Sequence, residues 1–371
     1  MAHVEVAVIG KGLIGTAATR HLAEAGRSVA LIGPDEAADR RTFPGPFSSH
    51  GDEGRITRIG DSDVSWARWA ARSIDRYADI ERRSGIGFHH PVGVVVAWPG
   101  LEEWDAVGRA AGADMAAVDA AWVRRETGIV VPEGPIRFEQ GPAGFINPRG
   151  LIAAQTMLAS SAGAAVIADT ATALTRSNGS WTVTTSATSV TADRVVVATG
   201  AFGRELLDEP VPATPFARTV ALIEFTEPLP GRRATPALVL AAPETDRLDQ
   251  MYWVPPVRYP DGRLRLKAGG THVDDVPIEP GRLVEWFRSD GDPEEVEALV
   301  QSVRAALPDA AIASVRSAPC VTTRTATGYP LVEALDSGLV LALGGNGQAA
   351  KSSDELGRLA AELAVDEPVH T

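Results

Sequence analysis

The N-terminal segment contains the feature that most restricts the fold, a glycine-rich turn between an apolar strand and a helix. Residues 4–9 read VEVAVI, which is typical of a buried parallel strand. Gly10, Gly12 and Gly15 then form G-x-G-x-x-G, before a helix predicted from Leu13 to Gly26 and a second strand over 28–32. Such glycines permit the turn, the approach of a pyrophosphate and helix–strand packing. The segment therefore predicts a dinucleotide site, with Ile14 in the helix turn that faces the pyrophosphate.

The end of the second predicted strand departs from this dinucleotide-binding pattern. An acidic residue usually closes that strand and binds the ribose hydroxyls, but here the sequence is LIGPDE, with Gly33 at that position. Asp35 or Glu36 could reach back to the ribose, and the sequence leaves both open.

A second stretch favours FAD over NAD as the dinucleotide. Residues 191–207 read TADRVVVATGAFGRELL, in which a short apolar strand ends at Thr199 and Gly200. An A-T-G at the end of a late strand returns the chain to the cofactor in FAD proteins of the glutathione-reductase-like type. It follows a β-rich stretch in which Asn178-Gly179 predicts a hairpin turn.

Length and charge restrict the kind of protein further. A chain of 371 residues is long enough for two structural domains, and a net charge of −13 makes nucleic acid an unfavourable partner. No apolar run has the roughly 18 residues of a membrane span. The single cysteine excludes an internal disulfide, and the seven histidines show no metal-ligand spacing. We expect a cytoplasmic monomer without a metal.

Four further segments carry a family resemblance: FSSHGDEGRITRIG (47–60), GRLRLKAGGTH (262–272), SVRSAPCVTTRT (314–325) and GLVLALGGNGQAAKSSDELGRLAAEL (338–363). With them the chain resembles the D-amino-acid-oxidase-type flavoproteins, in particular the monomeric sarcosine oxidase and N-methyltryptophan oxidase branch. The resemblance implies a two-domain α/β (α+β) protein. A discontinuous Rossmann-like FAD-binding domain would comprise 1–85, 145–210 and 315–371, and a β-sheet-rich substrate domain would comprise 86–144 and 211–314.

The resemblance assigns the loop in the first segment to the flavin. Ser49 and His50 would lie near the cofactor, and Arg55 would lie close to the isoalloxazine ring. Arg58 would bind the substrate carboxylate, a role that suits arginine because its planar fork makes two parallel hydrogen bonds. From the residues alone, a solvated charged loop remains the alternative.

The resemblance assigns Lys267 to the reaction with oxygen. This residue alternates with leucines in a predicted strand, so its side chain should lie on the opposite face from Leu264 and Leu266. In the family a lysine here promotes oxidation of the reduced flavin by O2, because a fixed ammonium stabilises the charge that develops on oxygen. A surface lysine on an edge strand is the alternative.

The resemblance also assigns the glycine-rich turn near the C-terminus to the flavin. The turn Gly344-Gly345-Asn346-Gly347 would pass beside the flavin pyrimidine, and the start of the helix predicted from near Ala350 would stabilise charge on the reduced ring.

Two residues after that turn bear on the substrate. Lys351 matches a lysine that pairs with the substrate carboxylate at the flavin. Gln348 stands where sarcosine oxidase has a histidine in the substrate pocket, which implies a different substrate.

Cys320 is, from the residues alone, either a small core hydrophobe or a nucleophile. By position it matches the cysteine through which the family links its flavin covalently as an 8α-S-cysteinyl group. Arg316 or Arg324 would favour its thiolate.

These predictions combine into one function. The protein would be an FAD-dependent oxidase that converts the C–N bond of a carboxylate-bearing secondary amine or cyclic imino acid to an imine, with O2 as acceptor and H2O2 as product. Its partners would be the small amine and O2. Tyr252 and Trp253 could line the substrate pocket. The alternatives are an FAD-dependent dehydrogenase or hydroxylase that does not use O2 as its direct acceptor, and a non-catalytic flavoprotein.

Overall fold

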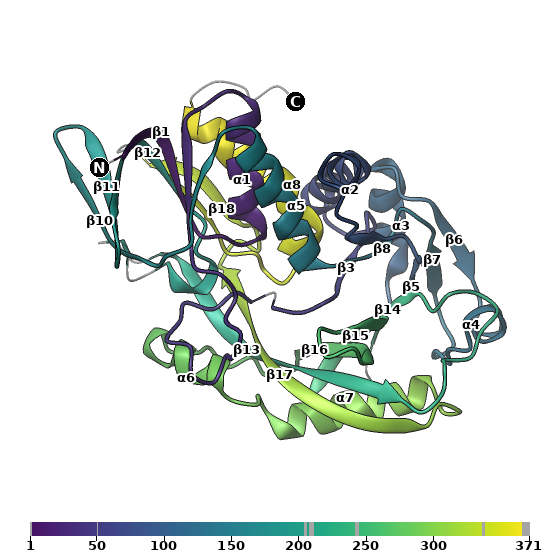
Figure 1. The fold of residues 1–371 in the computed structure, drawn as a ribbon. Coiled ribbons are helices and arrows are strands. Elements are labelled where there is room, and N and C mark those ends of the chain that lie inside the picture. The colour runs from purple at the N-terminus through teal and green to yellow at the C-terminus, as the bar shows by residue number, and fades with distance from the viewer. Residues whose placement is uncertain are drawn as a thin grey trace.

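The chain folds around two large β-sheets and one small one (Figure 1). The computed structural model describes residues 2–49, 51–203, 206–207, 211–241, 245–335 and 338–365. The first large sheet has the order β10-β11-β12-β1-β2-β9, and β19 pairs with β12 and β18 with β19. Its strands are β1 (Ala2–Ile9), β2 (Val29–Ile32), β9 (Ala165–Ile167), β10 (Ala171–Ser177), β11 (Ser180–Thr185), β12 (Ser189–Val197), β18 (Leu331–Leu335) and β19 (Leu339–Leu343).

Three helices cover one face of the first sheet: α1 (Leu13–Glu24), α5 (Pro148–Ser161) and α8 (Ala349–Val365) (Figure 1). β1 pairs in parallel with both β2 and β12, so the predicted strand–turn–helix–strand unit is confirmed. Gly26 has a φ of +78° just after α1, which allows the chain to leave the helix there. The hairpin turn is confirmed too, because Asn178-Gly179 joins β10 to β11 with positive φ at both residues.

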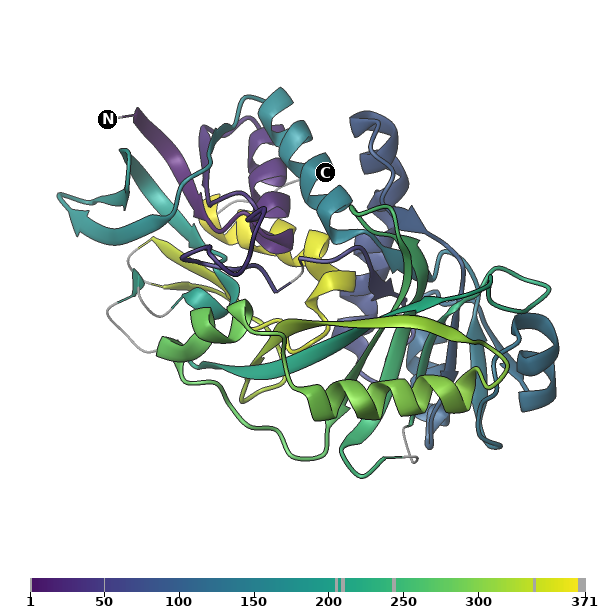
Figure 2. The same cartoon turned by 60° about the horizontal axis from the view of Figure 1, so that its bottom comes forward.

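The second large sheet has the order β17-β13-β16-β15-β14-β5-β7-β6. Its strands are β5 (Val94–Ala97), β6 (Met115–Val118), β7 (Ile136–Glu139), β13 (Ala213–Phe225), β14 (Ala237–Ala241), β15 (Leu248–Arg258), β16 (Leu264–His272) and β17 (Ile312–Thr325). Helix α7 (Pro293–Ala306) runs along this sheet (Figure 2) and packs apolar residues against one face. The opposite face is thereby left to the functional site.

The remaining elements connect and flank these sheets. The small sheet pairs β8 (Gly144–Ile146) with β3 (Arg55–Thr57) and β4 (His89–His90). The other helices are α2 (Val64–Ser84), α3 (Leu101–Ala110), α4 (Ala120–Thr127), α6 (Leu283–Arg288) and the 3-10 turns η1 (Gly200–Phe202) and η3 (Pro280–Arg282). No helix in the described part of the chain combines the length and apolar character of a membrane span.

Strand pairing places one segment differently from the expected division. Residues 315–325, which we assigned to the FAD-binding domain, lie in β17, and β17 pairs along its length with β13 of the second sheet. The domain division itself stays a prediction.

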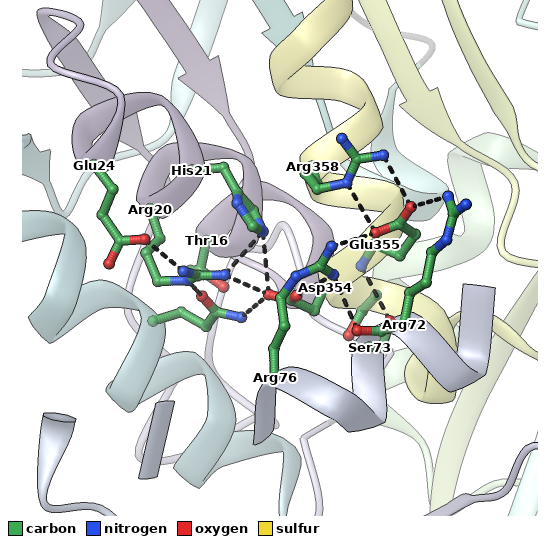
Figure 3. Close-up of polar contacts among 12 residues, drawn as sticks. Thr16, Arg20, His21, Glu24, Arg72, Ser73, Arg76, Asp354, Glu355 and Arg358 are labelled. Atoms are coloured by element: carbon green, nitrogen blue, oxygen red, sulfur yellow. Dashed lines mark hydrogen bonds and ion pairs between the residues drawn. The ribbon is translucent and has the colours of Figure 1, made fainter. Parts of the chain in front are cut away.

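A buried ionic network fixes helix α8 against α1 and α2 (Figure 3). The Asp354 carboxylate accepts hydrogen bonds from Arg20 Nη2 at 2.8 Å and from Arg76 Nη1 at 3.0 Å. Arg20 Nη2 also donates to His21 Nε2 at 2.8 Å, and burial lowers the pKa of this histidine against the opposing effect of Asp354. Because the first turn of α8 carries Lys351, the network also fixes where that lysine lies.

Candidate functional site

A cavity of about 1180 Å³ lies between the two large sheets and is lined by residues from both. At one end it meets the glycine turn after β1 and the start of α1, and at the other it meets the free face of the second sheet. The volume exceeds the range of roughly 300–1,000 Å³ usual for small-molecule pockets, as a dinucleotide together with a substrate requires.

The dinucleotide end has the close approaches that the glycine pattern predicts. Gly10, Gly12, Leu13 and Ile14 line the cavity. Gly10 has a φ of +116°, and a Cβ on it would lie 2.3 Å from the Ala198 carbonyl oxygen. Gly15 lies behind the lining, where a Cβ would meet the Gly10 oxygen at 1.9 Å. Both positions therefore require glycine.

Two observations show that this end fits a cofactor. Gly12 is the N-cap of α1, and because it has no side-chain cap the first amides of the helix are left for a ligand. Thr199 and Gly200 also line the cavity, and the buried Thr199 Oγ1 has no hydrogen-bond partner among the described residues.

The structure explains why glycine replaces the acidic residue after β2. A Cβ on Gly33 would lie 2.6 Å from the Lys11 backbone nitrogen, so a side chain there would collide with the glycine turn. Asp35 and Glu36 both line the cavity, but Asp35 pairs with Lys11, and Glu36 pairs with Arg149 at 2.6 Å. Which of them contacts the ribose stays a prediction.

Lys267 belongs to a buried cluster with Asp52 and Arg55, which we call the Asp52 cluster. Lys267 Nζ donates to Asp52 Oδ2 at 2.6 Å and to the Gly54 carbonyl at 2.8 Å, and Arg55 Nη2 lies 2.9 Å from the same carboxylate. Lys267 is fully buried in β16, between β13 and β15, so the alternative of a surface lysine on an edge strand is wrong. Burial, reinforced by the charge of Arg55, lowers the pKa of Lys267 to about 8. Asp52 and Arg55 line the cavity, and Lys267 lies behind them.

Arg58, Asp61 and Lys351 form a second group, the Asp61 cluster, and all three line the cavity. Lys351 Nζ donates to Asp61 Oδ2 at 2.5 Å, whereas Arg58 Nη1 lies 3.8 Å from the same oxygen. Burial, together with the charge of Arg58, lowers the pKa of Lys351 to about 8. Burial alone would raise the pKa of Asp61, but the two cations outweigh it and lower that pKa. The structure thus brings Arg58 and Lys351 together, as predicted, around a carboxylate that was not predicted.

Two neighbours hold Arg58 in place. Its guanidinium lies over the Trp104 ring, 5.3 Å from the centroid. The backbone after it is anchored by Glu139, whose carboxylate accepts the Ile59 and Gly60 amides at 2.7 and 3.0 Å. Arg58 Nη1 itself is buried without a hydrogen-bond partner among the described residues. The hydrogen-bonding capacity of this donor is therefore unused within the described part of the chain, and Arg58 lines the cavity.

Cys320 lies in the cavity wall, and a different arginine from those predicted is its neighbour. Its Sγ is 3.6 Å from Arg55 Nη2 and 3.2 Å from the Ser49 carbonyl oxygen, and Ser49 also lines the cavity. Arg316 is instead exposed beside Asp261, and Arg324 pairs with Asp275. The arginine beside the Cys320 sulfur is therefore Arg55, which comes from a segment distant in sequence, and not Arg316 or Arg324 as expected.

The glycine turn before α8 reaches the cavity as predicted. Gly344, Gly345, Asn346, Gly347 and Gln348 all line it. Asn346 has a φ of +50°, and its Oδ1 accepts the Thr325 amide at 3.0 Å, which ties the turn to β17.

The other predicted residues divide between the cavity wall and the core. Tyr252 lines the cavity, but Trp253 is buried on the α7 side of β15, where its Nε1 donates to the Pro236 carbonyl at 3.1 Å. Trp253 is thus a core residue and does not wall the pocket. His50 lies outside the described residues.

The sequence prediction missed the carboxylates of both clusters, although the sequence contains a signal for them. Asp52 lies three residues before Arg55, and Asp61 lies three residues after Arg58. In the structure each arginine lies beside the carboxylate three residues away, Arg55 at 2.9 Å from Asp52 and Arg58 at 3.8 Å from Asp61, so this spacing was the local signal for both. Nothing local indicated Glu139.

Comparison with known proteins agrees with this geometry. Residues 5–363 match the family described as FAD dependent oxidoreductase (DAO), while comparison with curated proteins gave no match. Among solved structures, NikD, an unusual amino acid oxidase essential for nikkomycin biosynthesis, has a TM-score of 0.79 at 20% identity, covering 100% of this chain and 96% of that one. L-proline dehydrogenase from P. horikoshii has a TM-score of 0.78 at 16% identity, covering 98% and 94%. Glycine oxidase from Geobacillus kaustophilus has a TM-score of 0.75 at 19% identity, covering 99% and 96%.

Identities this low show a shared fold alone, whereas the family match spans nearly the whole chain. The chain belongs to the DAO family of FAD-dependent oxidoreductases.

Proposed function

We propose that the protein oxidises the C–N bond of a carboxylate-bearing secondary amine or cyclic imino acid to an imine, with O2 as acceptor and H2O2 as product. The bound flavin supplies the two-electron acceptor for the hydride that leaves the carbon beside nitrogen. Water then hydrolyses the imine, and O2 takes up two electrons and two protons. The observation that carries the proposal is Arg58 in the cavity wall, whose Nη1 has no hydrogen-bond partner among the described residues.

Arg58 binds and orients the substrate carboxylate in this proposal. Its side chain is 17% exposed, and Trp104 and the anchored backbone after it limit its motion. A guanidinium held in this way offers a carboxylate two parallel hydrogen bonds, which restricts the rotation of the bound molecule. The carbon next to the carboxylate is then fixed relative to the cofactor, and that positioning lowers the barrier to hydride transfer.

The cofactor would be held from both sheets. Gly10, Gly12 and the start of α1 would take the pyrophosphate, and the turn 344–347 would border the ring. Cys320 would carry the covalent attachment, which is supported by its place in the cavity wall and by the adjacent Arg55 cation.

Lys267 would assist the reaction with oxygen. Its ammonium is buried with Arg55 around a single carboxylate, so the Asp52 cluster formally carries one net positive charge beside the cavity. Such a charge in a poorly solvated site stabilises negative charge that develops on O2.

A second candidate function is a flavin dehydrogenase that passes electrons to another acceptor. It is favoured by the position of Lys267, which lies behind Asp52 and Arg55 rather than in the cavity lining. A flavoprotein without catalysis is disfavoured, because the two clusters bring four cations to the cavity, Arg55, Lys267, Arg58 and Lys351. One of them, Arg58, also has a donor that no described residue uses.

A screen of N-methyl, cyclic and primary amino acids tests the proposal. Peroxide production and anaerobic bleaching of the flavin absorbance are measured in parallel, with a dye as alternative acceptor. We expect an amine that bleaches the flavin and yields nearly one peroxide per turnover. Arg58→Ala should abolish saturation by that amine, while Arg316→Gln, at an exposed arginine away from the cavity, should not change it. Bleaching without peroxide would assign the dehydrogenase, and an amine equally well oxidised by Arg58→Ala would contradict the carboxylate role.

A further inference from the structure

A third ionic cluster borders the same cavity and has no part in the function proposed above. Asp275 lies 2.7 Å from Arg218 Nη2 and also pairs with Arg324. We call these three residues the Asp275 cluster. Arg218 is 6% exposed, and its Nη1 donates to the Ala217 carbonyl at 2.6 Å.

The two arginines of this cluster face the cavity, and its carboxylate lies behind them. Arg218 and Arg324 line the cavity, whereas Asp275 does not. Arg218 is the register partner of Cys320 across β13 and β17, so both side chains project from the same face of the sheet. The contact of Arg218 Nη2 with Asp275 is close but lacks hydrogen-bond geometry. Asp275 is therefore the internal competitor of any anion that binds Arg218 from the cavity.

The charges of the three clusters suggest what such a ligand is. Each cluster joins two cations to one carboxylate and so formally carries one net positive charge. The Asp52 cluster serves the oxygen reaction and the Asp61 cluster serves the carboxylate in the proposed function. The pyrophosphate of the dinucleotide is placed by the glycine turn on the first sheet. The Asp275 cluster therefore has a positive charge that no part of the reaction or cofactor uses.

The Asp61 and Asp275 clusters lie toward opposite ends of the cavity floor. Arg218 comes from β13, while the backbone after Arg58 is anchored by Glu139 on β7, and the sheet order places five strand spacings between them. This corresponds to roughly 24 Å between the β13 and β7 backbones. The lining between them includes the apolar side chains of Leu222 and Val239, together with Tyr252 and the Asp52 cluster. The floor thus has a positive charge at each end, with both apolar and polar side chains between them.

We propose that Arg218 and Arg324 form a second anion subsite and that the substrate is a dicarboxylic amine. One carboxylate, next to the C–N bond, would bind Arg58. A second acidic group, separated from it by an apolar spacer, would bind at the Asp275 cluster. That the dicarboxylic amine is oxidised rests on the proposed function, whereas the anion subsite can be tested by binding alone.

Simple acids of graded length test the subsite in the flavin-loaded protein. Calorimetric titration compares dicarboxylates from succinate to suberate with monocarboxylates of the same chain length. We expect one dicarboxylate length to bind at least tenfold more tightly than its monocarboxylate partner. Equal affinity of the two series at every length would overturn the subsite.

Variants that lower or raise the net charge of the Asp275 cluster test whether the dicarboxylate preference depends on this cluster. Arg218→Gln should reduce the dicarboxylate preference to twofold or less and leave monocarboxylate affinity unchanged. Asp275→Asn removes the internal competitor and should increase the preference, a gain that misfolding cannot produce. Arg316→Gln, on β17 like Arg324 but exposed, is the matched control and should change neither series.

The remaining outcomes separate the subsite from the proposed reaction. If Arg218→Gln lowers the flavin content and keeps the dicarboxylate preference, the cluster serves the cofactor and the subsite is wrong. If Arg58→Ala leaves both series unchanged, the proposed function fails at its carboxylate contact, whatever the Arg218 variant shows. If a monocarboxylic amine is oxidised as well as every dicarboxylic one, the proposed function stands and the subsite is overturned.

Discussion

Lys351 is expected to act on the substrate carboxylate indirectly, by holding Asp61 away from Arg58. Its Nζ lies 2.5 Å from Asp61 Oδ2, while Arg58 Nη1 is 3.8 Å from that oxygen and has no hydrogen-bond partner among the described residues. Removing the ammonium in Lys351→Met would leave a buried carboxylate whose remaining cationic neighbour is Arg58. Asp61 should then pair with Arg58 and compete with the substrate.

The size of the effect follows from the bond that the substrate loses. A hydrogen bond to a charged group contributes about 1.5–3 kcal/mol, and each 1.4 kcal/mol is tenfold in affinity. Lys351→Met should therefore weaken carboxylate binding roughly ten- to hundredfold. Adding Asp61→Asn removes the competitor, so the double variant should recover native affinity to within about 0.5 kcal/mol, the usual scatter of additive effects.

Titration with methylthioacetate, followed by the flavin absorbance, measures this cycle in the native protein, both single variants and the double variant. A double variant that binds as weakly as Lys351→Met would refute the reasoning and show that Lys351 contacts the carboxylate itself.

The pH dependence of carboxylate affinity provides a second check. The pKa of Lys351 is lowered to about 8, so its ammonium is present below this pH and lost above it. Carboxylate affinity should fall as the pH rises through about 8 in the native protein, but not in the double variant.

Three further predictions concern the flavin, oxygen and stability. Cys320→Ser should allow acid to release intact FAD into the supernatant, whereas the native protein should keep its yellow colour in the pellet; acid-released FAD from the native protein would exclude the covalent link. Lys267→Met should slow reoxidation by O2 at least tenfold, about 1.4 kcal/mol, with less effect on anaerobic reduction. Because the pKa of Lys267 is lowered to about 8, reoxidation of the native protein should slow as the pH rises through that value. If Lys267→Met slowed reduction and reoxidation equally, the result would argue against an oxygen role for this lysine. Asp354→Asn removes the buried carboxylate shared by Arg20 and Arg76 and should lower the free energy of unfolding in denaturant by about 1.5–3 kcal/mol, the value of a charged hydrogen bond. Arg72→Ala, at a 58% exposed arginine that pairs with the neighbouring Glu355, should cost under about 1 kcal/mol; equal losses would show that burial does not decide the contribution.

The dinucleotide unit could be predicted from the sequence because its determinants are local. The spacing of Gly10, Gly12 and Gly15 fixes a turn between two adjacent elements, and the structure shows the close contacts that exclude a side chain at the first and third positions. The hairpin at Asn178-Gly179 was predictable for the same reason. Strand, turn and helix depend on neighbouring residues, whose periodicity and φ preferences the sequence contains.

The lysine partners of the two cavity carboxylates were decided by the tertiary structure alone. Asp61 pairs with Lys351 from 290 positions further along the chain, and Asp52 pairs with Lys267 from 215 positions further. The sequence supplied the residue types and, through the three-residue spacing, the arginine neighbours of these carboxylates, but nothing local indicated the two lysines. Likewise, the alternation along β15 put Tyr252 and Trp253 on opposite faces, but only the packing of α7 decided which face is core. These pairings matter because burying a charge without a partner costs free energy. The partner can come from a distant part of the sequence, because the packing of the sheets brings such segments together.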